Sequence, residues 1–205
     1  MEKIGVVSVT YNSGKVLNSF IDDLLAQSYS NFILYVVDNA STDSTLRVID
    51  KYLDPRIKTT KNNYNKGVAA ANNLGIKSAL ADNCSQILLL NNDIEFSADL
   101  FANLLDEQEK HKCNIVAPKI MYHHNKDIIW YAGGWFNKKR GYLPSHRGIN
   151  EKDYGQYDKA LQIEYASTCC LLINKEVFDH LGFMDEKYFV YFDDTDFLFR
   201  VFQNN

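Results

Sequence analysis

The sequence has no excess of positive charge, since its 22 Lys and Arg residues face 26 Asp and Glu residues, for a formal net charge of −4. Non-specific binding of nucleic acid needs a dominant basic face, so we expect no nucleic-acid partner. No apolar run approaches the roughly 18 residues of a membrane-spanning helix, and the short run at residues 4–9 lacks the cleavage site of a signal peptide. We therefore expect a cytoplasmic protein without a transmembrane span, at most associated with the inner face of the membrane.

Cysteines are few and are not spaced for zinc or for a disulfide framework. The four are Cys84, Cys113, Cys169 and Cys170, and no two of them form a C-x-x-C pair. We expect reduced, packed thiols and hence a reducing compartment. The sequence also lacks the G-x-x-x-x-G-K-[ST] motif, which argues against a P-loop kinase or ATPase.

The first half of the sequence alternates short apolar runs with amphipathic patterns. The predicted elements are strand 4–9, helix 16–25, strand 32–37, helix 46–53, helix 66–80, strand 87–90 and helix 100–105. Strands that alternate with helices of this length imply an α/β fold, in which a mainly parallel sheet has helices on both faces. Ligands bind such sheets at the carboxyl ends of the strands.

The second half is less regular and is expected to form a smaller, irregular part. Its predicted elements are strands 115–120, 128–132, 163–166 and 170–173 and helices 175–181 and 193–202. The polar residues 137–159, which include Lys138, Lys139 and Arg140, predict a long loop of a kind that often has a function. The last predicted helix reaches the end of the chain without a capping glycine, so we expect the domain to continue beyond Asn205.

Asn91, Asn92 and Asp93 follow the apolar strand at residues 87–90. A carboxylate at the tip of a buried strand points into the crevice at the edge of the sheet. One carboxylate combined with diphosphate oxygens is a usual way to hold Mg²⁺ or Mn²⁺. A strand-end turn rich in Asn and Asp explains the same residues without a ligand, and this segment alone leaves both interpretations open.

A second acidic group begins the last predicted helix, where Asp193, Asp194 and Asp196 follow the aromatic residues of the segment 188–192. Free backbone N–H groups and the helix dipole stabilise carboxylates at such a position, which is a sufficient structural explanation. Clustered carboxylates also shift one another's pKa, as a general base requires. An aromatic wall beside carboxylates is a common way to hold a sugar, so the cluster is a candidate catalytic site.

Polar residues elsewhere in the first half favour a nucleotide. Tyr11 follows the first strand and is placed to stack on a base, while Asp38 or Asn39 is placed to hydrogen-bond the edge of that base. The segment at residues 65–67, Asn-Lys-Gly, opens a predicted helix, where free N–H groups and a lysine favour a phosphate. A glycine before a helix is also common in plain turns.

With these residues in view, the sequence resembles glycosyltransferase family 2, an inverting family with the GT-A fold, and the rhamnosyltransferase-like branch is one candidate within it. The motifs are V-S-V-T-Y-N at 7–12, V-V-D-N-A-S-T-D-S-T at 36–45, N-K-G-V-A-A-A-N-N at 65–73, L-L-L-N-N-D at 88–93, I-W-Y-A-G-G at 129–134, L-L-I-N-K-E-V-F-D-H-L-G-F-M-D-E-K-Y-F at 171–189 and Y-F-D-D-T-D at 191–196. The resemblance implies one GT-A domain over residues 1–205. Residues 1–95 would form its nucleotide-binding half and residues 96–205 its sugar and acceptor half.

The resemblance also implies roles for individual residues. The expected nucleotide-sugar ligands are Thr10, Tyr11, Asn12, Asp38, Asn39, Asn65, Lys66, Gly67, Asn91, Asn92 and Asp93. Among these, Asp93 matches the last acid of the D-x-D-like motif and is expected to face a divalent metal, Mn²⁺ or Mg²⁺, and the donor diphosphate. Asn91 replaces the first acid of that motif.

Asp194 matches the aspartate of the family's E-D motif and is the expected catalytic base, while Asp193 stands where glutamate is usual. The residues expected on the sugar and acceptor side are Trp130, Gly133, Gly134, Thr168 and Tyr191. Thr168 and Cys169 replace a Gly-Ala pair that is common in the donor-sugar loop, so the resemblance does not specify the sugar.

The implied reaction is a single displacement with inversion, in which an acceptor hydroxyl loses its proton to Asp194 and attacks the anomeric carbon of a UDP- or dTDP-sugar. A metal takes up charge on the leaving diphosphate. The implied partners are the nucleotide-diphosphate sugar donor and a glycan or lipid-linked acceptor, in surface polysaccharide biosynthesis, with peripheral membrane association through residues beyond Asn205.

Two alternatives remain beside this reaction. A sugar-phosphate nucleotidyltransferase would need a first loop rich in glycine and arginine, which residues 10–14 do not provide. A non-catalytic domain that binds a nucleotide-sugar or a carbohydrate would use the same residues without turnover.

Overall fold

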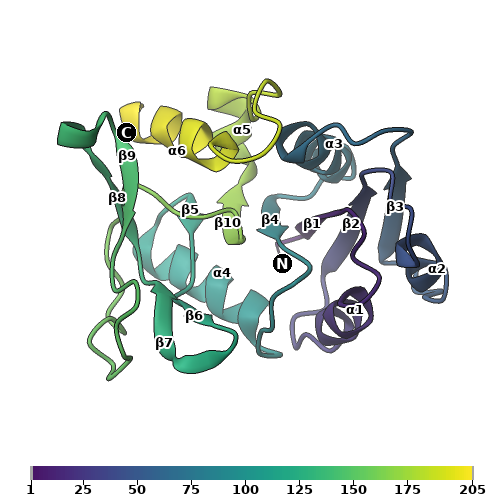
Figure 1. Cartoon of the computed structure of the whole chain (residues 1–205), viewed down its shortest axis with the longest axis horizontal. Coiled ribbons are helices and arrows are strands. Elements are labelled where there is room, and N and C mark those ends of the chain that lie inside the picture. The colour runs from purple at the N-terminus through teal and green to yellow at the C-terminus, as the bar shows by residue number, and fades with distance from the viewer. Residues whose placement is uncertain (1, 205) are drawn as a thin grey trace.

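The computed structural model describes residues 2–204, which fold around one six-stranded sheet flanked by helices (Figure 1). In spatial order the strands are β3 (Ile57–Lys61), β2 (Phe32–Asp38), β1 (Ile4–Thr10), β4 (Gln86–Leu90), β10 (Cys170–Asn174) and β5 (Ile115–Val116). The first four run parallel, and β10 runs antiparallel to both of its neighbours. This mainly parallel sheet confirms the predicted fold class.

Helices cover both faces of the sheet because its central strands are apolar on both sides. One layer contains α1 (Leu17–Leu25), α2 (Thr45–Ile49) and α4 (Leu100–His111), and the other contains α3 (Val68–Ala81), α5 (Lys175–Leu181) and α6 (Asp193–Gln203). Successive residues of a strand point to opposite faces. In β1, Val6 therefore packs in the layer of α1 and Val7 in the layer of α3.

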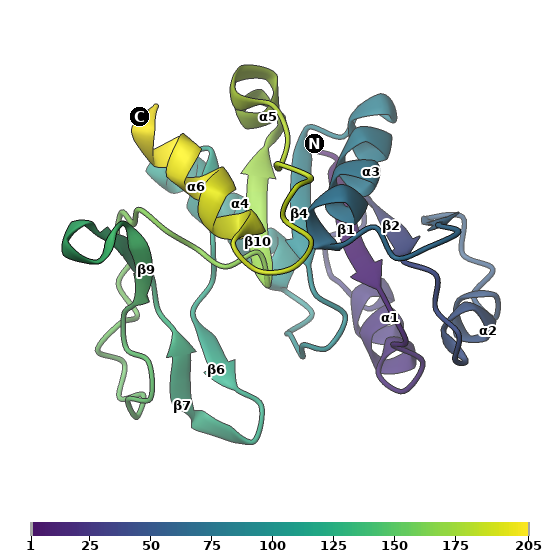
Figure 2. The same cartoon turned by 45° about the horizontal axis from the view of Figure 1, so that its top comes forward.

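Two hairpins extend the structure beyond the β5 side of the sheet (Figures 1 and 2). They pair β6 (Ile120–Tyr122) with β7 (Asn125–Tyr131), and β8 (Gly134–Asn137) with β9 (Leu143–His146) through the 3₁₀ helix η1 (Lys138–Arg140). The Tyr142 ring lies 4.9 Å from the Phe199 ring, centroid to centroid, and this contact holds the β8–β9 hairpin against α6. Within residues 2–204, no helix combines the length and apolarity needed to cross a membrane.

Two predicted strands are not continuous in the structure. Residues 163–166 form only an isolated bridge between Tyr165 and Gly134, because the chain crosses the end of β8 instead of running along it. The predicted strand at residues 115–120 divides into β5 and β6. Pro118 lies between these strands and has no N–H group to donate to a ladder.

Two polar segments are more ordered than predicted. Part of the expected loop at residues 137–159 forms η1 and β9, because backbone pairing with β8 closes a hairpin there. The strand β3 was not predicted, since Ile57 is its one apolar residue. It lies at the edge of the sheet, where exposed polar side chains are accepted.

The helix expected at residues 46–53 ends earlier, at Ile49.

Gly75, midway along α3, lets this helix lie directly on β1. A Cβ atom at this position would overlap the side chain of Val7. We expect Gly75→Ala to lower the free energy of unfolding by about 1–3 kcal/mol, the typical cost of overpacking a core, as measured by urea denaturation.

Adding Val7→Ala removes the overlapping atoms, so the double variant should lose less stability than the sum of the two single changes. Strictly additive losses would contradict the proposed overlap.

Candidate active site

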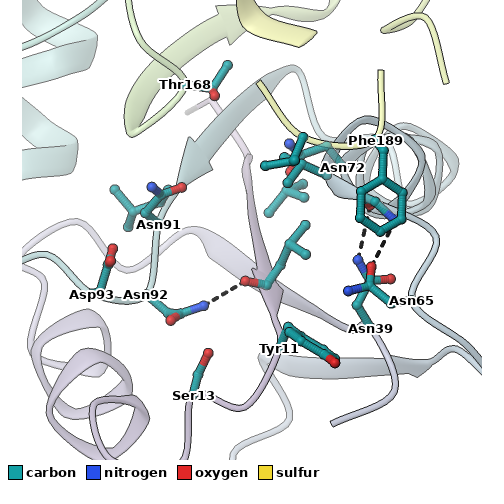
Figure 3. A pocket seen from close by; sticks show the side chains of 16 residues that line it. Tyr11, Ser13, Asn39, Asn65, Asn72, Asn91, Asn92, Asp93, Thr168 and Phe189 are labelled. Atoms are coloured by element: carbon teal, nitrogen blue, oxygen red, sulfur yellow. Dashed lines mark hydrogen bonds between the residues drawn. The ribbon is translucent and has the colours of Figure 1, made fainter. Parts of the chain in front are cut away.

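A cavity of about 370 Å³ opens at the carboxyl ends of β1, β2 and β4 (Figure 3). Eight of the residues predicted from the sequence line it: Tyr11, Asn39, Asn65, Gly67, Asn91, Asn92, Asp93 and Thr168. They converge because the carboxyl ends of parallel strands meet at one edge of the sheet. Ser13 and Asn72 also line the cavity and were not predicted. Asn72 is a polar residue within the apolar first part of the predicted helix, and this was the signal in the sequence by which it could have been found.

Three predicted ligands, Thr10, Asp38 and Asn12, bond to other protein groups. Thr10 and Asp38 are buried, and the Thr10 hydroxyl donates to Asp38 Oδ1 at 3.0 Å, while Asp38 Oδ2 accepts from the Ser41 N–H at 3.0 Å. Asn12 Oδ1 accepts from the Thr42 N–H at 2.9 Å. These bonds join the loops that follow β1 and β2, and none of the three predicted residues is among those that line the cavity.

Asn39 is buried directly after β2, and its side chain is hydrogen-bonded to the segment that leads into α3. Its Nδ2 donates to the Gly67 backbone oxygen at 3.0 Å. Its Oδ1 accepts from Asn62 Nδ2 at 2.9 Å and from the Lys66 N–H at 3.4 Å. The amide therefore fixes the segment that leads into α3, and Lys66, predicted to meet a phosphate, does not line the cavity.

The start of α3 touches the aromatic loop, residues 188–192, at Gly67. The φ angle of Gly67 is 85°, and a Cβ atom there would lie 2.5 Å from the Phe189 backbone oxygen. That oxygen accepts from the Val68 N–H at 2.6 Å. Because glycine has no side chain, the loop rests directly on α3, and Phe189 closes one side of the cavity (Figure 3).

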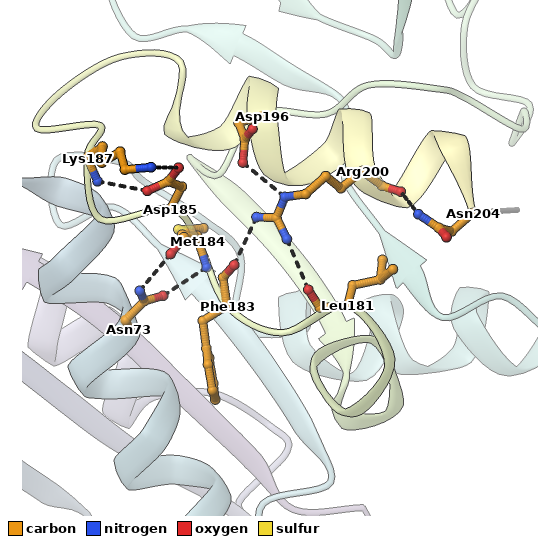
Figure 4. A network of polar contacts seen from close by, with 9 residues as sticks. All are labelled: Asn73, Leu181, Phe183, Met184, Asp185, Lys187, Asp196, Arg200 and Asn204. Carbon is orange, nitrogen blue, oxygen red and sulfur yellow. Dashed lines mark hydrogen bonds and ion pairs between the residues drawn. The ribbon is translucent and has the colours of Figure 1, made fainter.

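Two polar networks hold the segment that precedes the aromatic loop, one from α3 and one from α6 (Figure 4). Asn73 of α3 accepts from the Met184 N–H at 3.1 Å and donates to the Met184 backbone oxygen at 2.9 Å. Arg200 of α6 donates to the backbone oxygens of Leu181 and Phe183 at 3.0 and 2.8 Å. These bonds join α3, α5 and α6 around the loop, while the aromatic side chains stay at least partly exposed.

Asp93 lies at the edge of the cavity as an exposed carboxylate, after a segment that is held on two sides. Asn92 Nδ2 donates to the Val9 backbone oxygen at 2.6 Å, and the Asn91 N–H donates to the Cys169 backbone oxygen at 3.0 Å. Burial and then the charge of Asp93 raise the pKa of the Cys169 thiol to about 11. Among the described residues, no three His, Cys, Asp or Glu side chains group as metal ligands.

This arrangement fits a hard divalent cation that is shared with a ligand. Asp93 offers one carboxylate, so Mg²⁺ or Mn²⁺ there would take its other oxygen ligands from a diphosphate and from water. Mg²⁺ in particular is often held by one or two carboxylates and substrate phosphates.

The two carboxylates at the start of α6 have different surroundings. Asp193 is 5% exposed, and its Oδ2 has no hydrogen-bond partner within residues 2–204. Burial and then the charge of Asp194 raise the pKa of Asp193 to about 6. Asp194 is half-buried, and its Oδ2 accepts from the Tyr165 hydroxyl at 3.0 Å. The carboxylate of Asp194 is thus partly accessible and held by a hydrogen bond, and neither Asp193 nor Asp194 is among the residues that line the cavity.

Tyr165 was not predicted as a site residue. It is buried, its backbone oxygen accepts from the Tyr131 hydroxyl at 2.9 Å, and its N–H donates to the Gly134 backbone oxygen at 3.2 Å. Gly133 and Gly134 do not line the cavity, and a Cβ at Gly134 would lie 2.9 Å from the Tyr165 ring. No motif reveals the bond to Asp194, since it joins residues 29 positions apart.

The other predicted sugar-side residues differ in their placement. Trp130 is half-buried and packs edge-on against His146, with 5.2 Å between ring centroids. Tyr191 lies in the aromatic loop, is 76% exposed and has a left-handed φ of 64°. Of this group, Thr168 alone is among the residues that line the cavity.

The family model described as Glycosyl transferase family 2 matches residues 5–182. The chain belongs to this family. The dTDP-rhamnosyl transferase RfbF of Shigella flexneri is 29% identical to this family 2 chain. The match covers 96% of this chain and 62% of RfbF. The Escherichia coli UDP-Glc:alpha-D-GlcNAc-diphosphoundecaprenol beta-1,3-glucosyltransferase WfaP is 37% identical over 79 residues, which are 38% of the chain and 32% of that protein.

Solved structures confirm the GT-A glycosyltransferase fold. TarS of S. aureus in complex with UDP has a TM-score of 0.71 and 19% identity over 96% of this chain and 54% of its own. The mannosyltransferase PcManGT of Pyrobaculum calidifontis, in complex with GDP-Man and Mn²⁺, has a TM-score of 0.67 and 16% identity over 95% of this chain and 50% of its own. The family 2 chain thus spans less than two thirds of the length of each of these proteins.

The buried Asp193 makes stability depend on pH. In an unfolded chain an aspartate ionises near pH 3.9, whereas its pKa here is about 6, so ionisation removes stability as the pH rises between these values. Asp193→Asn abolishes this loss. We expect its free energy of unfolding, relative to the wild type, to rise by up to about 2 kcal/mol between pH 4 and pH 7, as measured by urea denaturation.

Asp179→Asn, which changes an exposed carboxylate on α5, is the matched control for replacing an aspartate by asparagine. A pH-independent difference for Asp193→Asn would contradict the burial of an ionisable Asp193.

Proposed function

We propose that this chain is the catalytic part of an inverting, metal-dependent glycosyltransferase that moves a sugar from a UDP- or dTDP-sugar to a hydroxyl of a saccharide or lipid-linked glycan in surface polysaccharide biosynthesis. One observation carries the proposal. A single cavity has the lone carboxylate Asp93 on its border and the aromatic loop on another side, and that loop leads directly into Asp193 and Asp194. The names of RfbF and WfaP support the choice of donor nucleotides and of a lipid-linked acceptor.

On the donor side, the chain offers a base platform and a charge. Tyr11 is 54% exposed beside the cavity, so its ring is accessible to a nucleobase. Asn65 and Asn72 add amide groups to the cavity wall. Asp93 would hold a divalent metal, which when bound would supply positive charge to stabilise the leaving diphosphate.

On the acceptor side, Asp194 takes the proton of the attacking hydroxyl. The hydroxyl oxygen bonds to the anomeric carbon while the bond from that carbon to the diphosphate oxygen breaks, and attack from the opposite face inverts the configuration. Tyr165 holds Asp194 Oδ2 and so orients the carboxylate. A positioned base contributes about 10²- to 10⁴-fold to such a step, and binding both substrates in line supplies a further part.

The metal site is tested by Asp93→Asn, which keeps the size of the side chain but removes its charge. We expect calorimetric affinity for UDP or dTDP in the presence of Mn²⁺ to fall to the metal-free value, because the cation loses its one protein carboxylate. Glu95→Gln removes a carboxylate from the same loop, one that pairs with Lys126, and should keep the effect of Mn²⁺. Unchanged Mn²⁺ dependence in Asp93→Asn would refute this site.

The base is tested by Asp194→Asn, which should lower the transfer rate at least about 100-fold with little change in donor affinity. Tyr165→Phe removes one hydrogen bond to the carboxylate and should lower kcat about tenfold, again without changing donor affinity. Tyr52→Phe is the matched control, since the Tyr52 hydroxyl donates to Asp22 at 2.9 Å on the far side of the domain. Full activity of Asp194→Asn would eliminate it as the base.

The function as a whole is tested by offering UDP- and dTDP-sugars with Mn²⁺ and a panel of lipid-linked and free glycan acceptors. Release of the nucleoside diphosphate together with glycosylated acceptor supports a transferase. Thermal stabilisation by the same donors without any turnover would favour the non-catalytic binding domain instead.

A further inference from the structure

The tip of the β8–β9 hairpin concentrates positive charge on an acidic protein. Lys138, Lys139 and Arg140 form η1, are exposed, and make no ion pair within the described part of the chain. Lys119 and Lys126, in the same half of the molecule, each pair with carboxylates. The tip therefore carries three adjacent unpaired positive charges, although the net charge of the whole chain is −4.

Two large apolar side chains share the outer face of this hairpin, next to its tip. The register pairs Trp135 with Ser145 and Asn137 with Leu143, and residues that lie opposite one another on two strands point to the same face. Trp135 is 44% exposed and Leu143 is 40% exposed. Phe136, on the other face, is buried against α6, so the outer face is the one left uncovered.

We propose that this hairpin tip binds the surface of an anionic membrane, with the three basic side chains against lipid phosphates and with Trp135 and Leu143 in the interfacial layer. Tryptophan is enriched at the level of lipid headgroups, and basic residues beside apolar ones are typical of segments that lie on membranes. Clustered basic residues are attracted by the negative surface potential of an anionic leaflet. The charge of the tip is thus complementary to this partner, whereas the rest of the protein is repelled by it.

The hairpin tip lies away from the carboxylates at which the proposed reaction takes place. Asp193 and Asp194 begin α6, and the tip lies near the other end of that helix, where Tyr142 packs on Phe199 (Figure 2). A membrane held at the tip leaves the donor cavity open. The inference does not depend on the proposed donor or base, and its failure would leave the proposed function intact.

Vesicle flotation of the full chain is the direct test, with vesicles of phosphatidylcholine alone and of phosphatidylcholine mixed with phosphatidylglycerol. Each basic residue near an anionic surface strengthens binding about fivefold, so the variant Lys138→Gln/Lys139→Gln/Arg140→Gln should bind the anionic vesicles on the order of 100-fold more weakly. Binding by the wild type should also weaken as salt screens the charges.

A matched control separates the site from overall charge. Lys51 lies in the turn after α2, Lys61 at the end of β3 and Lys175 at the start of α5. All three are exposed, and their triple change to Gln alters net charge by the same amount. This control should keep most of the binding. Equal losses in the two triple variants, or no binding of the wild type to anionic vesicles at low salt, would overturn the proposal.

Tryptophan fluorescence tests the apolar part. The chain has 2 Trp residues, and insertion of Trp135 should shift emission to shorter wavelength on anionic vesicles, with the shift lost in Trp135→Phe. A shift that persists in Trp135→Phe would come from Trp130 and would overturn the proposed insertion. If an RNA homopolymer binds the protein as strongly as the anionic vesicles do, and the vesicles cause no shift of the tryptophan emission, the tip would be assigned to nucleic acid instead.

Discussion

The rest of the structure depends on the central strands of the sheet, whose side chains are buried on both faces. All five residues of β4 are buried, so the first accessible polar groups follow only where this strand has ended, at Asn91. Parallel neighbours end at the same edge, and the antiparallel β10 begins there, opposite Leu90. That edge therefore collects polar residues from both halves of the chain, and the cavity, the lone carboxylate and the segment containing Thr168 all depend on it.

Elements with a strong local pattern could be predicted from the sequence. The apolar run ending at Leu90 and the amphipathic repeat of α1 each reveal a buried element, and their alternation reveals a parallel sheet. Once the sheet is known, Tyr11 and Asp93 belong at its carboxyl edge, and the structure places both beside the cavity. The roles of these residues in binding and catalysis remain predictions.

What could not be predicted depends on pairings between distant segments. Asp38 and Asn39 carry side chains that suit a ligand, yet their hydrogen bonds go to protein groups. The path of the folded chain decides which donors and acceptors come near them. Tyr165 reaches Asp194 only because a bridge to Gly134 turns the chain across β8. The order of the β8–β9 hairpin likewise follows from its pairing and its contact with α6, which residue types alone do not reveal.

The bond between Asn73 and Met184 has a consequence for synthesis of the protein. The two residues are 111 positions apart, so Asn73 leaves the ribosome well before its partner has been made. At synthesis rates of about 5–20 residues per second, the delay is on the order of 6 to 22 seconds. During that interval the two hydrogen bonds between Asn73 and Met184 cannot form. The cavity residues between Tyr11 and Asp93 are therefore synthesised well before the segment that carries Asp193 and Asp194.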